Sequence, residues 1–241
     1  MRTARADVLA RYIINFRVEP STARSLLPVD WLEPQIVNGF AVMSFCPYVL
    51  DAVRVGGLPK MFGISSICSA YRLAVLDLST PTPRPAAWVP ARQTNARAVA
   101  TLGPRSLRTS FERIRATITD EASTATTSIR MSHRNGDTHF LASVQPAVRP
   151  YGMLFEDTEA FANFFTAATT SWAPSSVTGS WMQLNLNAGD TCYSPLTVTE
   201  VGVGVGVGVG VGVGVGVGVG VGVGGPYRWS CAGLRDSQQT Q

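Results

Sequence analysis

Polar side chains crowd one stretch of otherwise apolar sequence, residues 88–102. Five of six consecutive positions there carry hydrogen-bonding side chains: Arg92, Gln93, Thr94, Asn95 and Arg97. Two guanidinium groups and an amide this close together can hold a carboxylate or a polarised carbonyl group. We therefore expect this stretch to line a pocket, with Arg92, Asn95 and Arg97 binding a small organic acid or carbonyl compound and Arg17 as a similar candidate. The alternative is a solvated turn in which the arginines cover apolar surface.

Lysine chemistry depends on one residue, because Lys60 is the sole lysine among the 241 residues. It stands in a loop rich in Gly and Pro, where we expect an exposed side chain with an ordinary pKa. The two histidines, His133 and His139, resemble a metal pair at first sight. A two-residue turn at Asn135-Gly136 would place them on opposite faces of a hairpin. We therefore predict ordinary histidines and no metal site.

The remaining motifs argue against several kinds of catalysis and cofactor. The acidic pairs at 120–121 and 156–157 stand at a turn and a helix start, where acids stabilise turns and caps. Gly220, Gly222 and Gly225 match a dinucleotide-binding spacing, but Pro226 prevents the helix that this motif requires. The four cysteines form no C-x-x-C pair, which argues against zinc and a disulfide framework. We assign no catalytic residue, no metal ligand and no cofactor.

Short segments of alternating hydrophobicity predict a mainly β protein. Strands are expected at 10–17, 35–37, 40–46, 64–78, 111–120, 123–132, 138–144, 181–186 and 196–201. Asn38-Gly39 supplies the positive φ angles of a two-residue type I′ turn between two of them. Helices are expected at 20–27, which begins at a proline, and after Asp157, a typical N-cap residue. Many short strands with two short helices indicate a closed or strongly curled antiparallel sheet with the helices packed outside it.

The last part of the chain differs from the rest. Val-Gly repeats twelve times from Val201 to Gly224, which is too long for one strand and too rich in glycine for a helix. We expect one β-barrel domain at 1–200, a disordered or loosely extended low-complexity tract at 201–225 and an irregular tail at 226–241. The tract is interpreted as an expanded simple repeat or a reading-frame shift that replaced the natural ending of the domain.

Charge and composition limit the partners. The net charge of +4 comes from scattered arginines without a basic run, so nucleic-acid binding is not expected. The Val-Gly tract is long enough to span a membrane, but an extended segment is favoured. Arg11 interrupts the N-terminal apolar run before it reaches the length of a signal peptide, so we expect a reduced, cytoplasmic setting. The oligomeric state is not indicated.

Five segments carry a resemblance to a known family: Arg11-Tyr-Ile-Ile-Asn-Phe-Arg-Val-Glu-Pro, Leu26-Leu-Pro, Leu32-Glu-Pro, Asn38-Gly-Phe-Ala-Val-Met-Ser-Phe and Arg92-Gln-Thr-Asn-Ala-Arg. Together they resemble an uncharacterised bacterial family related to acetoacetate decarboxylase, over roughly residues 5–200. The resemblance implies a mainly antiparallel barrel or cone with a central cavity.

The same resemblance argues against decarboxylation. True acetoacetate decarboxylases form a Schiff base on a lysine of lowered pKa, from a Lys-Lys pair that follows the strand corresponding to 88–92. This chain has Asn95-Ala-Arg-Ala-Val in that region and no lysine. The acidic residue of the decarboxylase site is also missing from the matching stretch, 41–45.

Three hypotheses follow. The first is a small-molecule-binding protein with an acetoacetate decarboxylase-like fold and no decarboxylase activity. The second is an enzyme of the same fold that uses arginine and water-mediated acid–base chemistry, which a titratable group of perturbed pKa near Arg92 would favour. The third is a truncated, non-functional domain, in which the repeat has removed strands that the barrel needs and has left a sheet edge exposed.

Overall fold

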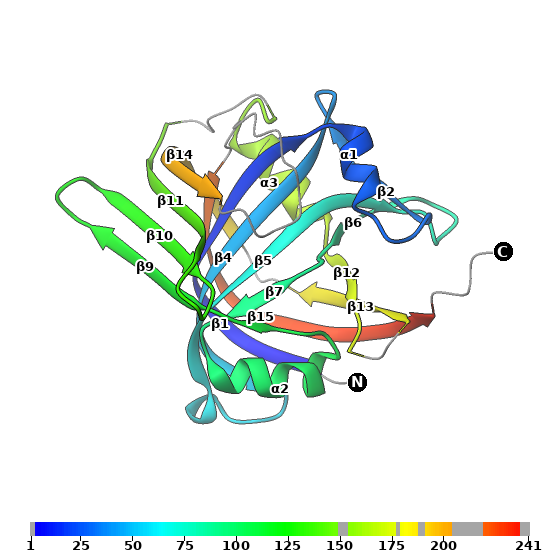
Figure 1. Cartoon of the computed structure of the whole chain (residues 1–241), viewed down its shortest axis with the longest axis horizontal. Coiled ribbons are helices and arrows are strands. Elements are labelled where there is room, and N and C mark those ends of the chain that lie inside the picture. Colours follow the sequence, from blue (N-terminus) through cyan, green and yellow to red (C-terminus); the bar gives the residue numbers. More distant parts are fainter. Residues whose placement is uncertain (1–2, 149–153, 177–178, 188–190, 204–218, 237–241) are drawn as a thin grey trace.

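The chain is built almost entirely of strands (Figure 1). This computed structural model describes residues 3–148, 154–176, 179–187, 191–203 and 219–236. The helices in these ranges are α1 (Pro20–Ser25), α2 (Arg97–Leu107) and α3 (Thr158–Ala167), with a 3-10 turn, η1, at Lys60–Phe62. The strands are β1 (Thr3–Val18), β2 (Leu32–Pro34), β3 (Ile36–Val37), β4 (Phe40–Val55), β5 (Ile64–Asp77), β6 (Arg84–Trp88), β7 (Arg92–Thr94), β8 (Glu112–Arg113), β9 (Arg115–Glu121), β10 (Thr126–Ser132), β11 (Thr138–Pro146), β12 (Thr170–Pro174), β13 (Ser180–Asn187), β14 (Thr191–Val203) and β15 (Val219–Asp236).

A closed ring of strands forms the body of the molecule. The order β1-β4-β5-β6-β12-β13-β15 returns to β1, because β15 pairs with both β13 and β1. Every pairing in this ring is antiparallel except that of β6 with β12. Closure satisfies the edge strands that an open sheet would leave unpaired. The mainly antiparallel barrel expected from the sequence is confirmed.

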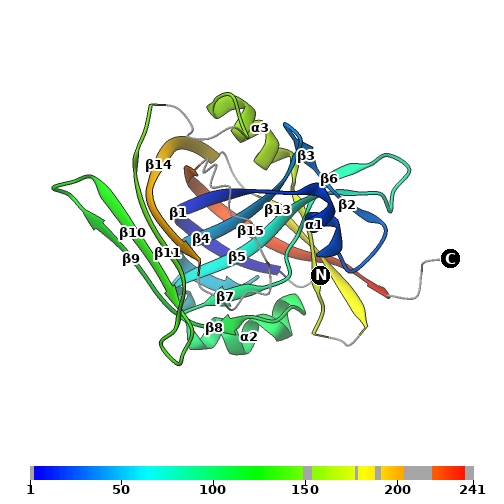
Figure 2. The same ribbon diagram turned by 45° about the horizontal axis from the view of Figure 1, so that its top comes forward.

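Four more strands continue from the ring as a ribbon. β14 pairs with the first half of β15, and β11, β10 and β9 follow in that order. Figures 1 and 2 show the far end of the β9–β10 hairpin projecting away from the barrel. We call β14, β11, β10 and β9 the outer ribbon.

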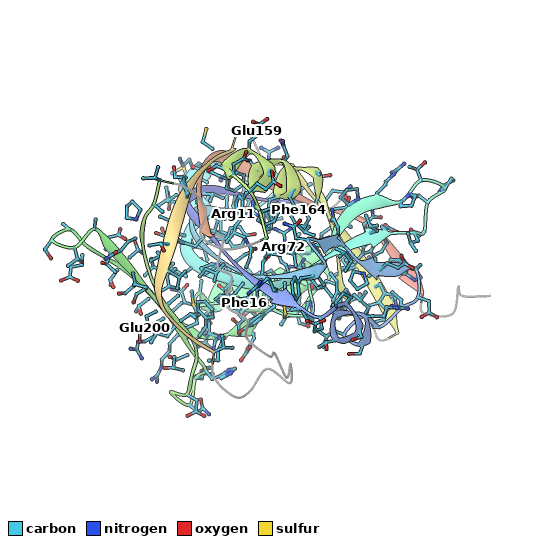
Figure 3. The ribbon with its side chains drawn as sticks, turned by 90° about the horizontal axis from the view of Figure 1, so that it is seen from above. Arg11, Phe16, Arg72, Glu159, Phe164 and Glu200 are labelled. Carbon is cyan, nitrogen blue, oxygen red and sulfur yellow. The ribbon has the colours of Figure 1, made fainter. Side chains whose placement is uncertain are left out.

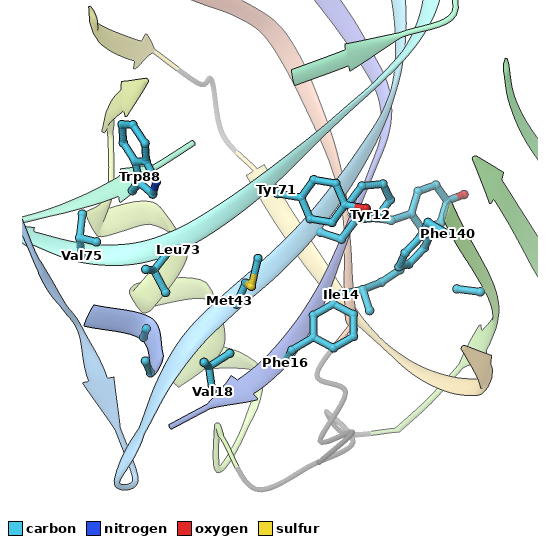
Figure 4. Close-up of a cluster of buried hydrophobic side chains, with 14 of the residues drawn as sticks. Tyr12, Ile14, Phe16, Val18, Met43, Tyr71, Leu73, Val75, Trp88 and Phe140 are labelled. Carbon is cyan, nitrogen blue, oxygen red and sulfur yellow. The ribbon is translucent and has the colours of Figure 1, made fainter. Parts of the chain in front are cut away.

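The largest hydrophobic core runs along the outer face of β1, β4 and β5, with the outer ribbon against one end of it and α1 and β2 against the other (Figure 4). Tyr12 and Ile14 of β1, Phe45 of β4 and Tyr71 of β5 come from alternate positions of their strands and are buried. Phe140 of β11 meets Phe45 with ring centroids 4.0 Å apart. Because side chains alternate along a strand, the remaining positions of β1, β4 and β5 face the inside of the barrel.

Two helices lie at opposite ends of the barrel, α3 at one end and α2 at the other (Figures 1 and 2). α3 begins where the sequence predicts, since the Asp157 carboxylate accepts a hydrogen bond of 2.7 Å from the backbone N–H of Ala160. Phe161 and Phe165 of its apolar stripe are buried. No helix in the described residues is long and apolar enough to cross a membrane.

The third helix, α2, was not predicted from the sequence. Its sequence carries Gly103 and Pro104 in its interior and lacks a capping side chain at Ala96, and each of these features weakens an isolated helix. A Cβ atom on Gly103 would lie 2.7 Å from the ring of Phe111. Glycine therefore allows α2 to pack closely on the segment that leads into β8, and tertiary packing outweighs propensity.

The two Asn-Gly turns differ. Asn38 and Gly39 have φ angles of 49° and 83° and join Val37 to Phe40, which confirms the predicted two-residue turn. At the second, the N–H of His133 donates to the carbonyl of Asp137, and only Gly136 has a positive φ, of 102°. This loop has three residues and shifts the register at its bulge.

The predicted placement of the two histidines on opposite faces of the hairpin was therefore wrong. Ser132 pairs with Thr138 instead of His139, and the rings of His133 and His139 lie together with centroids 4.5 Å apart. The loop has one residue more than predicted, and the bulge at His139 absorbs it, so that Met131 still pairs with Phe140 and only the side chains next to the turn change their placement.

The C-terminal part is more regular than the sequence suggests. Residues 201–203 of the repeat end β14, and residues 219–236 form β15, which pairs with β1, β13 and β14. The expected irregular tail is wrong for 226–236, and β15 occupies the edge that the truncated-domain hypothesis leaves exposed. Residues 204–218 and 237–241 lie outside the described residues. The division into a domain at 1–200, a tract and a tail stays a prediction.

Candidate functional site

A pocket of about 190 Å³ lies against the inner face of the barrel. Cys68, Ala70 and Arg72 of β5 line it, while the alternate residues Tyr71 and Leu73 belong to the outer core. Leucines of β4 and β13 form further parts of the wall, and α2 covers one side. The pocket is thus built from the strand positions that the outer core does not use.

Among the described residues, three arginines line this pocket, Arg54, Arg72 and Arg92, and no Asp or Glu does. Arg92 of β7 pairs directly with Ala70, and Arg72 stands two positions further along β5. Both side chains therefore leave the sheet on the same face, as diagonal neighbours that are typically about 7–8 Å apart. At this spacing, two guanidinium groups can share one carboxylate.

The contacts of the arginines differ in strength. Arg72 lies 6.0 Å from the ring centroid of Phe165 in α3 and makes no ion pair with any described residue. Arg92 donates to the hydroxyls of Thr109 and Ser171 at 3.4 and 3.3 Å, which is the long limit of a hydrogen bond. Arg54 donates to the carbonyl of Ala52 at 2.7 Å. The partners named here for Arg72 and Arg92, an aromatic ring and two hydroxyl groups, carry no formal charge.

A fourth arginine, Arg11, lies beside the pocket on the inner face of the barrel, where it pairs with Tyr48. Arg11 is 3% exposed and donates to the Tyr193 hydroxyl at 3.1 Å. Its guanidinium lies 5.4 Å from the ring of Tyr48, which lines the pocket. Figure 3 shows Arg11 and Arg72 towards the middle of the molecule, near Phe164 of α3. An anion in the pocket would therefore lie in a positive field.

The stretch 88–102 does line the pocket, through Val89, Arg92, Ala98, Val99 and Leu102. Of the individual residues predicted to bind, only Arg92 is among the lining residues. The Asn95 side-chain oxygen accepts hydrogen bonds from the N–H of Ile67 and the Ser66 hydroxyl, at 2.9 and 3.3 Å, and so holds β7 to β5. Arg97 is exposed at the start of α2. Arg17 lies 5.2 Å from the ring of Phe40.

Arg72 and Arg54 were missed by the sequence reasoning. Arg72 stands in Ala70-Tyr-Arg-Leu-Ala-Val, an alternating apolar segment with one charge on the face opposite Tyr71 and Leu73. A single charged residue inside an otherwise apolar strand segment was the signal in the sequence that could have identified Arg72 as a candidate binding residue. Arg54 offered none, because it precedes the Gly-rich loop and reads as a loop residue.

The titratable groups of the pocket are poor acid–base catalysts. Burial raises the pKa of the Cys68 thiol, so it stays protonated at neutral pH. Lys60 is not among the lining residues and forms an ion pair of 2.5 Å with Asp7. The hydrogen bond to Asp7 raises the pKa of Lys60, whereas a Schiff-base lysine needs a lowered one.

A second polar cluster lies outside the barrel, beneath the outer ribbon. The Gln93 side-chain oxygen accepts from the Ser69 hydroxyl and from His139 Nε2, at 2.9 and 3.0 Å, while its nitrogen donates to Glu112 at 2.9 Å. Glu112 also accepts from His133 Nδ1 at 2.7 Å. Because the amide oxygen only accepts, His139 carries its proton on Nε2. The described residues hold no group of three side chains placed to bind a metal.

The pKa values in this cluster follow from burial and neighbouring charge. Burial, and then the charge of His133, lower the pKa of His139. Burial tends to raise the pKa of Glu112, but hydrogen bonds from Gln93 and His133 outweigh it and the net shift is downward. The cluster at neutral pH therefore contains a neutral buried histidine beside a carboxylate.

No family model and no curated protein matches the sequence. Solved structures match over nearly the whole chain. One is an acetoacetate decarboxylase-like enzyme from Sphingomonas wittichii RW1, with a TM-score of 0.62, 13% identity, and coverage of 98% of this chain and 92% of that chain. The chain has an acetoacetate decarboxylase-like fold. Acetoacetate decarboxylase from Legionella pneumophila matches with a TM-score of 0.66, 9% identity, and coverage of 98% and 88%.

A third similar structure is the enduracididine biosynthesis enzyme MppR complexed with pyruvate. Its TM-score is 0.61 at 13% identity, over 98% of this chain and 90% of that chain. At such identities the likeness shows the fold and leaves the chemistry to the residues of each chain.

Proposed function

We propose that the protein binds a small organic acid or carbonyl compound in the barrel pocket and does not form a Schiff base with it. The observation that carries the proposal is a mainly apolar pocket in which the described lining residues include three arginines and no Asp or Glu. Arg72 and Arg92 are the residues that would hold the acid group. Pyruvate bound by MppR, a protein of the same fold, supports a ligand of this class.

Two finer expectations from the sequence, the family and the cellular setting, are part of this proposal. Membership in an uncharacterised bacterial family related to acetoacetate decarboxylase rests on the segments around Asn38 and Arg92. A cytoplasmic setting agrees with the free thiols of Cys46, Cys68 and Cys192. The alternative, acid–base catalysis near Arg92, gains no support from the part of the chain that the structure describes, where no Asp, Glu, His or Lys lines the pocket.

Isothermal titration of the full chain with pyruvate, acetoacetate and their amides tests this function. The acids should bind and the uncharged amides should not. Losing a hydrogen bond to a charged group costs about 1.5–3 kcal/mol, so Arg72→Met and Arg92→Met should each weaken binding by about tenfold or more. Arg97→Met makes the same change at an exposed residue and is the matched control.

Two results would overturn the proposal. One is that no acid binds, or that Arg97→Met weakens binding as much as the two pocket variants do. The other concerns covalent chemistry: borohydride added with pyruvate should leave Lys60 unmodified, and a reduced adduct on Lys60 in the mass spectrum would contradict simple binding.

A further inference from the structure

The walls of the pocket are far more apolar than a very small acid requires. Branched aliphatic side chains come from three separate elements: Leu50 of β4, Val99 and Leu102 of α2, and Leu184 and Leu186 of β13. Pyruvate carries a single methyl group, so it would leave most of this surface without a partner. An apolar wall contributes to binding only where a ligand removes it from water.

The size of the pocket indicates how large that apolar part is. Its volume is about 190 Å³, and an engineered cavity of about 150 Å³ lined by similar side chains holds benzene. The pocket therefore accommodates an apolar body of about six to eight carbon atoms. A chain or ring of this size fills the space between the leucines of β13 and helix α2.

The positions of the charged and apolar lining residues define the orientation of the ligand in the pocket. Arg72 and Arg92 lie together on the inner face of β5 and β7. At the rim, Val55, Ile64 and Leu102 line the pocket and are 40%, 36% and 49% exposed. An acid group at the arginines thus places the apolar end of the ligand towards an apolar rim. A second charge at that end would lose water among aliphatic side chains unless it reached Arg54, which stands next to Val55 and also lines the pocket.

We propose that the ligand is a monocarboxylic acid with an apolar body of about six to eight carbon atoms, either a medium-chain or an arylalkyl acid. This inference rests on the proposed function and specifies the class of acid. Arg54 also lines the pocket, and its guanidinium donates to the carbonyl of Ala52. We assign the carboxylate to Arg72 and Arg92 because these two side chains lie together on the inner face of β5 and β7.

The test is a calorimetric series on the full chain, from propanoate to octanoate, with 3-phenylpropanoate, adipate and pyruvate alongside. Each buried methylene stabilises binding by about 0.8 kcal/mol, which is about a fourfold gain in affinity. Affinity should rise at this rate and level off once the tail reaches the rim. Hexanamide should bind at least tenfold more weakly than hexanoate, because a charged hydrogen bond is lost.

A variant that fills the pocket distinguishes the contribution of the apolar body to binding from that of the acid group. Val99→Phe on α2 should weaken the binding of hexanoate by at least tenfold and should weaken the binding of pyruvate by a smaller factor, because pyruvate lacks the apolar body. Val148→Phe is the matched control, since Val148 is 99% exposed and is not among the lining residues. The melting midpoint of each variant shows that it has folded.

The outcomes distinguish the two proposals. If pyruvate binds as tightly as hexanoate, the apolar-body inference is overturned while the proposed function stands. Tighter binding of adipate than of hexanoate would overturn the monocarboxylate and assign a second acid group to Arg54. If none of the acids binds, both proposals are wrong.

Discussion

Replacing Gln93 by Leu should lower the free energy of unfolding by more than the loss of a single hydrogen bond would. Gln93, Ser69 and His139 are each only 2% exposed. Leucine has nearly the same volume but leaves the Ser69 hydroxyl and the His139 Nε2–H without their acceptor. A buried group left unsatisfied costs about 1–3 kcal/mol. The side chain of Glu112 is 44% exposed, so water can replace its lost donor.

Two orphaned donors, less the added apolar contact of leucine, lower the free energy of unfolding by about 3 kcal/mol. For a chain of this length, each kcal/mol shifts the melting midpoint by about 2–4 °C, so Gln93→Leu should melt about 6–12 °C lower. Urea unfolding of the full chain at pH 7.5 measures the free energy directly. Ser69→Ala removes one donor together with its need for an acceptor and should cost about 1 kcal/mol.

Gln145→Leu is the matched control for the substitution itself. Gln145 is half-buried and donates to the hydroxyl of Thr126 at 2.8 Å, where water can take over the partner. It should cost under about 1 kcal/mol. If Gln93→Leu costs no more than Gln145→Leu, the buried network beneath the outer ribbon does not hold the ribbon to the barrel, and the reasoning fails.

Three further predictions concern the rest of the molecule. Deleting residues 201–241 removes β15 from between β1 and β13, so cooperative melting should be lost, while deleting 237–241 should change little; a cooperative melt of the 1–200 fragment would show that the ring does not need β15. Burial, and then the charge of His133, lower the pKa of His139, so between that pKa and the ordinary value near 6.5 the unfolded chain binds a proton that the folded chain does not. Stability should therefore decrease as pH falls through this window, and His139→Phe should flatten the decrease in urea titrations across pH; an unchanged slope would contradict this origin. Finally, Cys192 is exposed whereas Cys68 is buried with a raised pKa, so iodoacetamide followed by peptide mass spectrometry should find Cys192 alkylated first, and equal rates would refute the burial of Cys68.

Most of the long strands and the start of α3 could be predicted from local sequence patterns. Alternation located the long strands, and Asp157 marked the start of α3, because these signals depend on neighbouring residues alone. Asn135-Gly136 shows where such reasoning ends. The dipeptide permits both a two-residue and a three-residue loop, and both lengths allow the buried residues Met131 and Phe140 to pair, because the bulge at His139 absorbs the extra residue of the longer loop. The placement of both histidines follows from the choice between these two loops.

The candidate site was only partly accessible from sequence for the same reason. Polar crowding identified Arg92, but it also drew attention to Asn95, whose amide oxygen is used to hold two strands together. Arg72 lies twenty residues upstream of Arg92 in the chain and becomes its neighbour only through the pairing of Ala70 with Arg92. Strand pairing is non-local, so no window along the sequence could have joined the two arginines.

The composition of β15 has a consequence for variation in the gene. From 219 to 224 this strand consists of Val-Gly units, whereas from Pro226 to Asp236 it is non-repetitive and pairs with β13. If the repetitive half of β15 slid by two residues along its partner strands, valine would replace valine and glycine would replace glycine. Only the non-repetitive half can therefore define the register in which β15 pairs. Replication slippage that adds or removes whole Val-Gly units upstream therefore leaves the sequence of β15 unchanged. Alleles that differ in repeat number would encode the same closing strand and differ only in the length of chain that leads to it.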